Sequence, residues 1–166
     1  MLKNNVKKQI LEAFPNALIP REILVNPSDW LVGDIPQSAC KELHLKSWDE
    51  VLLNNWLCIA TIPSVMSILK PQAFHYYLPS LLTGVMDNPD YFDWGVSALL
   101  PNNKNHERKG VWWIEYESLF NAPQRRAMMI FFDYIEEESD ELNESKYLAQ
   151  TAKIFWMDSV KAASVE

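Results

Sequence analysis

The amino-acid sequence predicts an all-α, or mainly α, fold in a single domain that spans residues 1–166. Three observations favour this fold class. Apolar side chains recur at the helical period in several segments, only four glycines are present, and most of the ten prolines lie at segment boundaries. With 166 residues, 48% of them apolar, the chain is long enough to bury a sizeable core. We expect a bundle of about five to seven helices around one central helix.

The central helix is expected at residues 71–87. Pro71 stands at its first position, where a missing N–H costs little, and an Asn-Pro dipeptide ends it. Pro79 lies inside the run and offers no N–H to the carbonyl of His75, so we expect a kinked helix, with the kink or a break near that residue. The apolar face of this helix follows the helical period and consists of Phe74, Tyr77, Leu78, Leu81, Leu82 and Val85.

The chain before the central helix is expected to hold a first helix, a proline-containing connection and three further helical segments, at residues 3–14, 15–37, 38–45, 48–62 and 64–69. Val6, Ile10 and Phe14 recur every four residues in the first helix. The connection is too apolar for a free linker, so we expect it to lie against the core. Ser47 and Glu50 form a capping box at the start of the fourth segment.

The chain after the central helix is expected to hold a short helix, a polar loop, an apolar segment and two long helices, at residues 91–100, 101–110, 111–120, 121–135 and 144–160. The polar loop is the best candidate for a mobile, exposed segment. Residues 111–116 are compatible with either a short strand or the lead-in to a helical turn. Asn121 and Gln124 form the capping box of the first long helix.

Two arginines, Arg125 and Arg126, lie in the first turn of that helix. The helix dipole disfavours cations at this end, so another interaction has to offset the cost. We expect these arginines either to pair with Glu115 or Glu117 or to form a surface contact.

The net charge of −7 is unevenly distributed along the chain. Residues 1–83 carry seven basic and seven acidic side chains, whereas residues 84–166 carry eight basic and fifteen acidic ones. This distribution favours a basic protein partner and argues against nucleic acid and anionic membranes. We find neither a secretory signal nor an apolar run of membrane-spanning length. Cys40 and Cys58 fit free thiols in a reducing compartment, so we expect a cytoplasmic protein.

The best candidate for an interaction surface is an acidic stretch between the last two helices. Residues 136–144 hold six acidic side chains. A cluster of this kind can dock a basic partner at an electrostatically steered rate, and the alternative is a solvated turn without a partner. The partner-binding residues that we predict are Asp133, Glu136, Glu137, Glu138, Asp140 and Glu141.

A second candidate region is a groove lined by His75, Tyr76 and Tyr77 in the central helix. A kinked helix can hold a titratable side chain near an exposed carbonyl, and His75 is then a candidate general base. The alternative interpretation is a histidine at the edge of the core whose ring nitrogens are satisfied by hydrogen bonds.

Nothing in the sequence predicts a metal or a cofactor. Asp87, Asp90 and Asp93 recur every three residues, but their spacing is not that of a calcium loop, so roles at helix ends are expected. His44 and His106 have no partner at zinc-ligand spacing. A glycine-rich phosphate loop and a nucleophile elbow are both missing. We therefore expect no cofactor and no enzymatic activity.

The segment from residue 70 to residue 82 resembles the PxAFxYYLPxxL signature of a family of small, uncharacterised bacterial proteins, a domain of unknown function. Residues that match a second motif and a final tryptophan follow later in the chain. The resemblance implies a bacterial, cytosolic, α-helical protein and implies no activity. The matching positions are Pro71, Ala73, Phe74, Tyr76, Tyr77, Leu78, Pro79, Leu82, Phe120, Pro123, Gln124, Arg125 and Trp156.

These observations favour an interaction protein without enzymatic activity. The most specific form of this hypothesis is an immunity protein that binds and neutralises a cognate bacterial toxin, because many such toxins are basic and an acidic inhibitor suits them. Two alternatives remain, an adaptor or housekeeping protein of unknown role and an enzyme that uses the His75 region.

Overall fold

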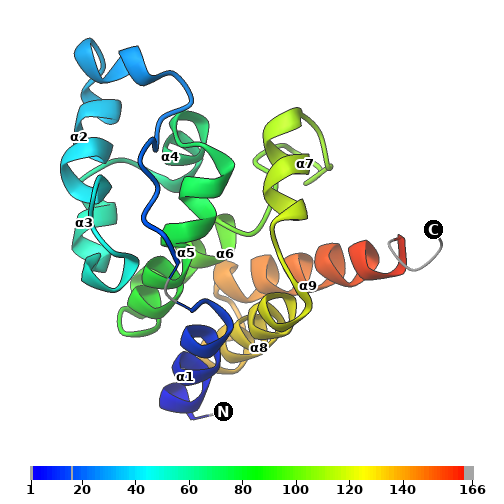
Figure 1. The fold of residues 1–166 in the computed structure, drawn as a ribbon. Coiled ribbons are helices and arrows are strands. Elements are labelled where there is room, and N and C mark those ends of the chain that lie inside the picture. Colours follow the sequence, from blue (N-terminus) through cyan, green and yellow to red (C-terminus); the bar gives the residue numbers. More distant parts are fainter. Residues whose placement is uncertain (1, 16, 163–166) are drawn as a thin grey trace.

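The computed structural model describes residues 2–15 and 17–162 of the chain. Over this part the fold is all-α, as predicted, with nine α-helices, three short 3₁₀ helices and no β-strand. Two extended segments meet only at an isolated antiparallel bridge between Leu24 and Leu69. In Figure 1, α2, α3 and α4 lie together on one side, α8 and α9 cross on the other, and α5 and α6 lie between them.

The central helix is α5, Pro71–Met86, which packs against α1, α3, α6 and α7. Its predicted apolar face is buried, and Leu78 and Leu81 are completely inaccessible to solvent. The helix continues through Pro79, so the predicted break is wrong, whereas the kink stays a prediction. Tertiary packing explains the continuity: Pro79 itself is buried, and the burial of its neighbours outweighs the hydrogen bond that the proline cannot donate.

The N-terminal half contains more and shorter helices than predicted: α1 Lys3–Ala13, η1 Pro27–Leu31, α2 Asp34–Leu43, η2 Trp48–Glu50, α3 Leu53–Leu57 and α4 Ile62–Ile68. The helix expected at residues 48–62 is divided at Val51 and Leu52, whose backbones are extended. The Asn55 side chain accepts a hydrogen bond from the Leu52 N–H at 2.8 Å and so starts a second helix. Local caps of this kind explain why the count exceeds five to seven.

The C-terminal half consists of η3 Pro89–Tyr91, α6 Phe92–Ser97, α7 Val111–Ser118, α8 Ala122–Glu138 and α9 Glu144–Ala162. The strand considered at residues 111–116 is wrong, because this segment forms α7. Trp113 and Tyr116 lie three residues apart and are both buried, which places them on one face of a helix. Gly110 precedes them with φ of 87°, a conformation that glycine adopts without steric cost.

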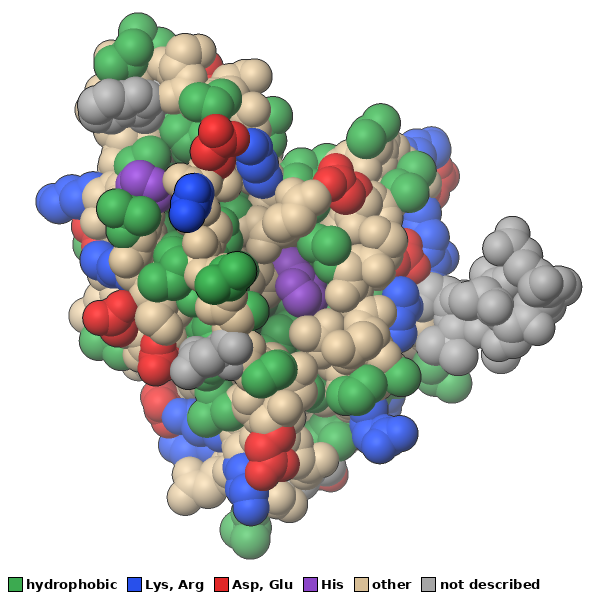
Figure 2. Space-filling model, viewed as in Figure 1, with side chains coloured by type: hydrophobic (Ala, Val, Ile, Leu, Met, Phe, Trp, Pro, Cys, Tyr) green, Lys and Arg blue, Asp and Glu red, His purple; other side chains and the backbone are tan. Residues whose placement is uncertain are grey.

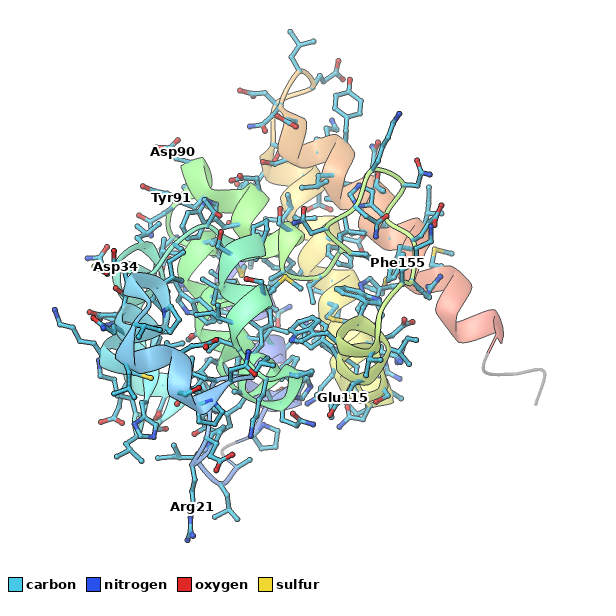
Figure 3. The ribbon with its side chains drawn as sticks, turned by 90° about the horizontal axis from the view of Figure 1, so that it is seen from above. Arg21, Asp34, Asp90, Tyr91, Glu115 and Phe155 are labelled. Atoms are coloured by element: carbon cyan, nitrogen blue, oxygen red, sulfur yellow. The ribbon has the colours of Figure 1, made fainter. Side chains whose placement is uncertain are left out.

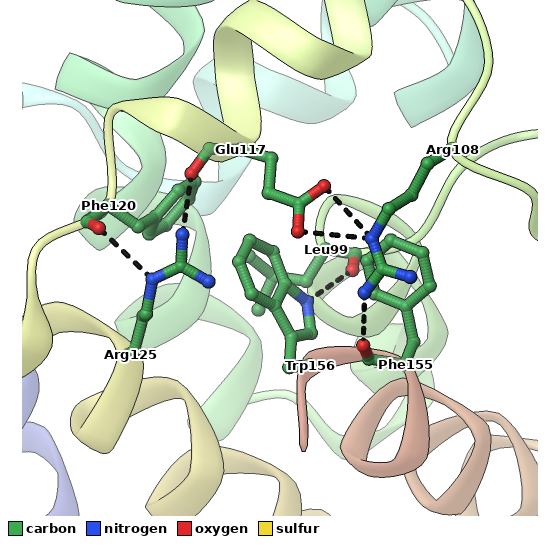
Figure 4. A network of polar contacts seen from close by, with 7 residues as sticks. All are labelled: Leu99, Arg108, Glu117, Phe120, Arg125, Phe155 and Trp156. Atoms are coloured by element: carbon green, nitrogen blue, oxygen red, sulfur yellow. Dashed lines mark hydrogen bonds and ion pairs between the residues drawn. The ribbon is translucent and has the colours of Figure 1, made fainter. Parts of the chain in front are cut away.

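One polar network joins α7, α8 and α9 (Figure 4). Arg108, from the loop that we expected to be mobile, donates from Nε to both Glu117 carboxylate oxygens at 3.1 Å, and its guanidinium lies 3.9 Å from the centre of the Phe155 ring. Arg125 donates to the backbone carbonyls of Glu117 at 3.0 Å and Phe120 at 3.1 Å. Arg125 therefore binds the carboxyl end of α7, where the dipole of α7 favours a cation. This interaction offsets the unfavourable position of Arg125 at the start of α8.

Buried side chains from α1 to α9 form one hydrophobic core. Its aromatic residues include a continuous cluster in which Phe74, Tyr116, Phe120 and Trp156 are linked by ring-to-ring distances of 5.0–5.5 Å. Within the part of the chain that the structure describes, no helix is both long and apolar enough to cross a membrane.

Candidate functional site

A groove opens where the extended segment after α1 passes over α5 and the start of α8. It encloses a cavity of about 440 Å³. Figure 2 shows this face of the molecule, with a histidine side chain at the bottom of a hollow between the two halves. We call this region the α5–α8 groove; its described lining residues are Phe14, Pro15, Ala17, Leu18, Pro20, Trp48, Gln72, His75, Tyr76, Asn121 and Gln124.

His75 lies in the wall of the α5–α8 groove, between two aromatic rings. Its ring centre is 5.5 Å from that of Phe14 and 4.7 Å from that of Phe120. Burial lowers the pKa of His75, and the hydrogen bond with Gln124, at 3.2 Å between Nε2 and Oε1, only partly opposes this shift. His75 is therefore neutral at pH 7. Because Gln124 Oε1 can only accept, we assign the proton to Nε2, which leaves Nδ1 as an acceptor.

The two tyrosines that follow His75 have different surroundings. Tyr76 is half-buried and lines the groove. Tyr77 does not line the groove, so its predicted place there is wrong. Its side chain is completely buried, and its hydroxyl donates to the carbonyls of Leu43 at 2.7 Å and Lys46 at 3.1 Å. The helical rotation of 100° per residue turns Tyr77 towards α2 while His75 and Tyr76 stay at the groove.

The start of α8 forms the far wall of the groove. Asn121 and Gln124 form the predicted capping box: Asn121 Oδ1 accepts from the Gln124 N–H at 2.9 Å, and Gln124 Oε1 accepts from the Asn121 N–H at 3.1 Å. Gln124 is thus shared between the helix cap and His75. On the other side, Gln72 donates through Nε2 to Glu115 of α7. These contacts fix which amide atoms remain for a ligand.

The acidic stretch forms the end of the α8–α9 hairpin. We call its members from Glu136 to Glu144 the acidic turn. Two of the predicted residues pair internally, because Lys153 of α9 lies 2.6 Å from Asp133 and 2.7 Å from Glu136. Burial raises the pKa of Glu136, but hydrogen bonds from Lys153 and Gln150 outweigh this effect and hold it below its ordinary value. The remaining predicted residues are exposed: Glu137, Glu138, Asp140 and Glu141.

Other side chains singled out from the sequence form no site. Asp87 pairs with Lys3 at 3.1 Å and with Lys7, and so ties α1 to the end of α5. Among the described residues, no group of three or more His, Cys, Asp or Glu side chains is placed to hold a metal ion. Cys40 and His44 line a separate cavity of about 320 Å³ beside α2.

Sequence reasoning missed Trp48, Asn121 and Gln124 as groove residues. The capping box at Asn121 was visible in the sequence, but its position opposite His75 was not. His75 and Gln124 are 49 residues apart, and only the packing of α5 against the start of α8 brings them together. A local pattern carries no signal for such a contact.

The fold defines a small all-α domain built on a central helix, with two candidate surfaces, the α5–α8 groove and the acidic turn. The chain belongs to a family of unknown function, DUF6714, whose model matches residues 35–160. This confirms the expected membership of such a family; the match includes the groove walls on α5 and α8 and leaves α1 outside. The comparisons found neither a matching curated protein nor a matching solved structure.

Proposed function

We propose that this protein is a non-enzymatic binding protein that docks a basic protein partner on the acidic turn. The observation that carries the proposal is the state of its side chains. Glu138, Asp140 and Glu141 are exposed, and none of the three forms an ion pair within the described part of the chain. They are therefore available to cations of a partner.

The position of these charges strengthens the argument. The last turn of α8 contains no basic residue and ends in three glutamates, although a helix dipole disfavours anions at that end. Lys153 offsets this cost for Glu136, whereas Glu138, at the very end of the helix, has no ion pair among the described residues. Acidic side chains that destabilise their own helix are better explained by a gain in binding than by a gain in stability.

The α5–α8 groove supports binding rather than catalysis. The hydrogen-bond partner of His75 is the Gln124 amide, not a carboxylate that would orient the ring and raise its basicity. Burial lowers the pKa of His75 and so weakens it as a base. These features make the enzyme hypothesis the weaker one.

The specific form that we favour is an immunity protein that neutralises a cognate bacterial toxin. A small acidic domain that binds a basic toxin domain gains its association rate from electrostatic steering. An adaptor with a harmless basic partner is the alternative. The two differ in what the partner does alone, which an experiment can decide.

The first test is purification of the tagged protein from its native host. We expect one basic protein to co-purify in stoichiometric amount. If this partner arrests growth when expressed alone and is tolerated when both are expressed together, the protein is an immunity protein; a harmless partner makes it an adaptor. If no protein co-purifies at low salt, the binding proposal is wrong.

Charge reversal locates the interface. Replacing Glu138, Asp140 and Glu141 with lysine together is expected to weaken partner binding by about tenfold or more and to reduce its salt dependence. The control replaces three exposed acids elsewhere, Glu12, Asp34 and Asp49, with lysine. In Figure 3, Asp34 lies on the α2 side, away from the α8–α9 hairpin. Equal effects of the two triple variants would show that only net charge matters.

A further inference from the structure

The α5–α8 groove has the features of a ligand site that is independent of the acidic turn. Its cavity of about 440 Å³ falls in the size range of small-molecule sites. Its wall combines the aromatic rings of Phe14, Trp48 and Tyr76 with the amides of Asn121 and Gln124. Aromatic walls with a few fixed polar groups favour flat ligands that need orientation.

The lining is electrically neutral. No Lys, Arg, Asp or Glu is among the described residues that line the cavity. The start of α8 is not an anion site either, because its capping box already uses the N–H of Gln124 and Pro123 has no N–H. A charged ligand would lose hydration here without gaining a counter-ion, so the cavity selects for a neutral one.

The polar atoms that remain include both donors and acceptors. Gln72 and His75 each use a nitrogen for a partner in the protein, which leaves Gln72 Oε1 and His75 Nδ1 as acceptors. Asn121 and Gln124 use their oxygens in the capping box, which leaves the NH₂ group of each as a donor. A ligand that fits this wall carries donors and acceptors close together on one edge.

Trp48 adds an aromatic ring to the wall of the groove. Its side chain is only 9% exposed, it lines the groove, and its indole N–H is buried without a hydrogen-bond acceptor among the described residues. A buried donor without a partner costs about 1–3 kcal/mol, and such groups are uncommon in folded proteins. Because this N–H has almost no solvent-accessible surface, a ligand in the groove meets the Trp48 ring and not its N–H.

We propose that the α5–α8 groove binds a small, neutral heteroaromatic molecule of the nucleobase type. The flat ring contacts the aromatic wall, and its donor–acceptor edge meets the amides of Asn121 and Gln124 and the acceptor nitrogen of His75. This inference goes beyond the proposed partner binding and does not depend on it.

The test uses adenine, uracil and nicotinamide as probes, with the charged rings benzoate and benzylamine for comparison. Binding is followed by protein-observed NMR and titration calorimetry. We expect at least one neutral probe to saturate the protein and to shift backbone resonances at the start of α8 and near His75, while the charged rings bind at least about tenfold more weakly. If none of the neutral probes saturates, or if the charged rings bind as well, the proposal is wrong.

Variants place the ligand. Asn121→Ser keeps a good helix cap but removes the side-chain NH₂, and His75→Phe keeps an aromatic ring but removes Nδ1. Each is expected to weaken binding about tenfold. His44→Phe, in the separate cavity beside α2, is the matched control and should bind as the wild type does. If Asn121→Ser, checked to be folded, binds as tightly as the wild type, the assignment of the groove is overturned.

The acidic-turn triple variant separates the two proposals. It is expected to lose the protein partner and to keep the heteroaromatic ligand. Loss of both activities in this variant would contradict an independent site, whereas failure of the probes alone would leave the partner binding unaffected.

Discussion

At the scale of single residues, His75 shows how surroundings determine chemical behaviour. In the sequence, two tyrosines follow it and Pro79 lies four residues further on. This context is compatible with a general base or with a histidine at the edge of the core that is satisfied by hydrogen bonds. The structure places His75 at the edge of the core between two aromatic rings, with Nε2 bonded to the Gln124 amide, and a role as a base stays a prediction. The two tyrosines show what the sequence alone does not predict. Tyr76 lines the groove and Tyr77 is buried, because the two adjacent side chains lie on different faces of α5.

His75 should make the stability of the protein depend on pH. Its folded-state pKa lies below the ordinary value of about 6.5, so the unfolded chain binds the proton more readily. Its contribution to the free energy of unfolding is fully present above that value and is lost as the pH falls through the folded-state pKa. We expect urea denaturation of the wild type to show a loss of stability between pH 7.5 and 5 that His75→Phe reduces.

No other titratable group is among the described side chains that contact the His75 ring, so the difference between the wild type and His75→Phe reports on His75. Phe14 and Phe120 carry no charge, and Gln124 does not titrate. The carboxyls with lowered pKa values, such as Asp87 and Glu136, titrate below this pH range. Parallel pH profiles for the wild type and His75→Phe would show that the histidine is as accessible to protons in the folded state as in the unfolded chain.

At the scale of elements, short-range signals predicted helices well and their lengths poorly. The capping box at Asn121 starts α8 as predicted, and hydrophobic periodicity located α1 and α5. The cap that divides the segment 48–62 was not predicted, because Leu52 looks like a helix-face residue until the Asn55 side chain bonds its N–H. Residues 111–116 form a helix because Trp113 and Tyr116 both face the core.

The junction of α7 with α8 gives a prediction at this scale. Arg125→Met removes hydrogen bonds to two carbonyls at the carboxyl end of α7 and a cation–π contact 5.1 Å from the Trp156 ring. We expect the free energy of unfolding in urea to fall by about 1–3 kcal/mol.

The neighbouring Arg126 is a matched control, since it is exposed and lies in the same turn of α8. Arg126→Met should change stability by less than about 0.5 kcal/mol. If the two variants lose stability equally, the hydrogen bonds from Arg125 to the end of α7 do not stabilise the fold. The loss then comes from removing a positive charge from the first turn of α8.

At the scale of the whole molecule, the sequence predicted the class of fold, the acidic stretch and one wall of the groove, at His75 and Tyr76. The acidic turn was predictable because its members are neighbours in the chain. The other walls of the α5–α8 groove were not predictable, because Phe14 and Gln124 come from segments that only tertiary packing brings to His75. His75 and Gln124 are 49 residues apart, and a separation of this length produces no periodic pattern in the sequence.

The first helix raises a question about the whole domain, because the family match begins at residue 35 and α1 lies outside it. The contacts of α1 argue that it belongs to the same folding unit. It packs against α5 and α8, and Val6 and Ile10 are completely buried in the common core. We therefore expect the domain to unfold in a single cooperative transition that includes α1.

Ile10→Ala tests this expectation. If α1 is part of the core, the lost burial and the remaining cavity lower the free energy of unfolding of the whole domain by about 2–5 kcal/mol without changing the denaturant slope. Leu11→Ala, at a neighbouring position that is 41% exposed, should cost much less. The contrary result is a separate early transition in Ile10→Ala that far-ultraviolet circular dichroism detects and the near-ultraviolet signals of the buried tryptophans do not. It would mean that α1 docks on a domain that folds without it.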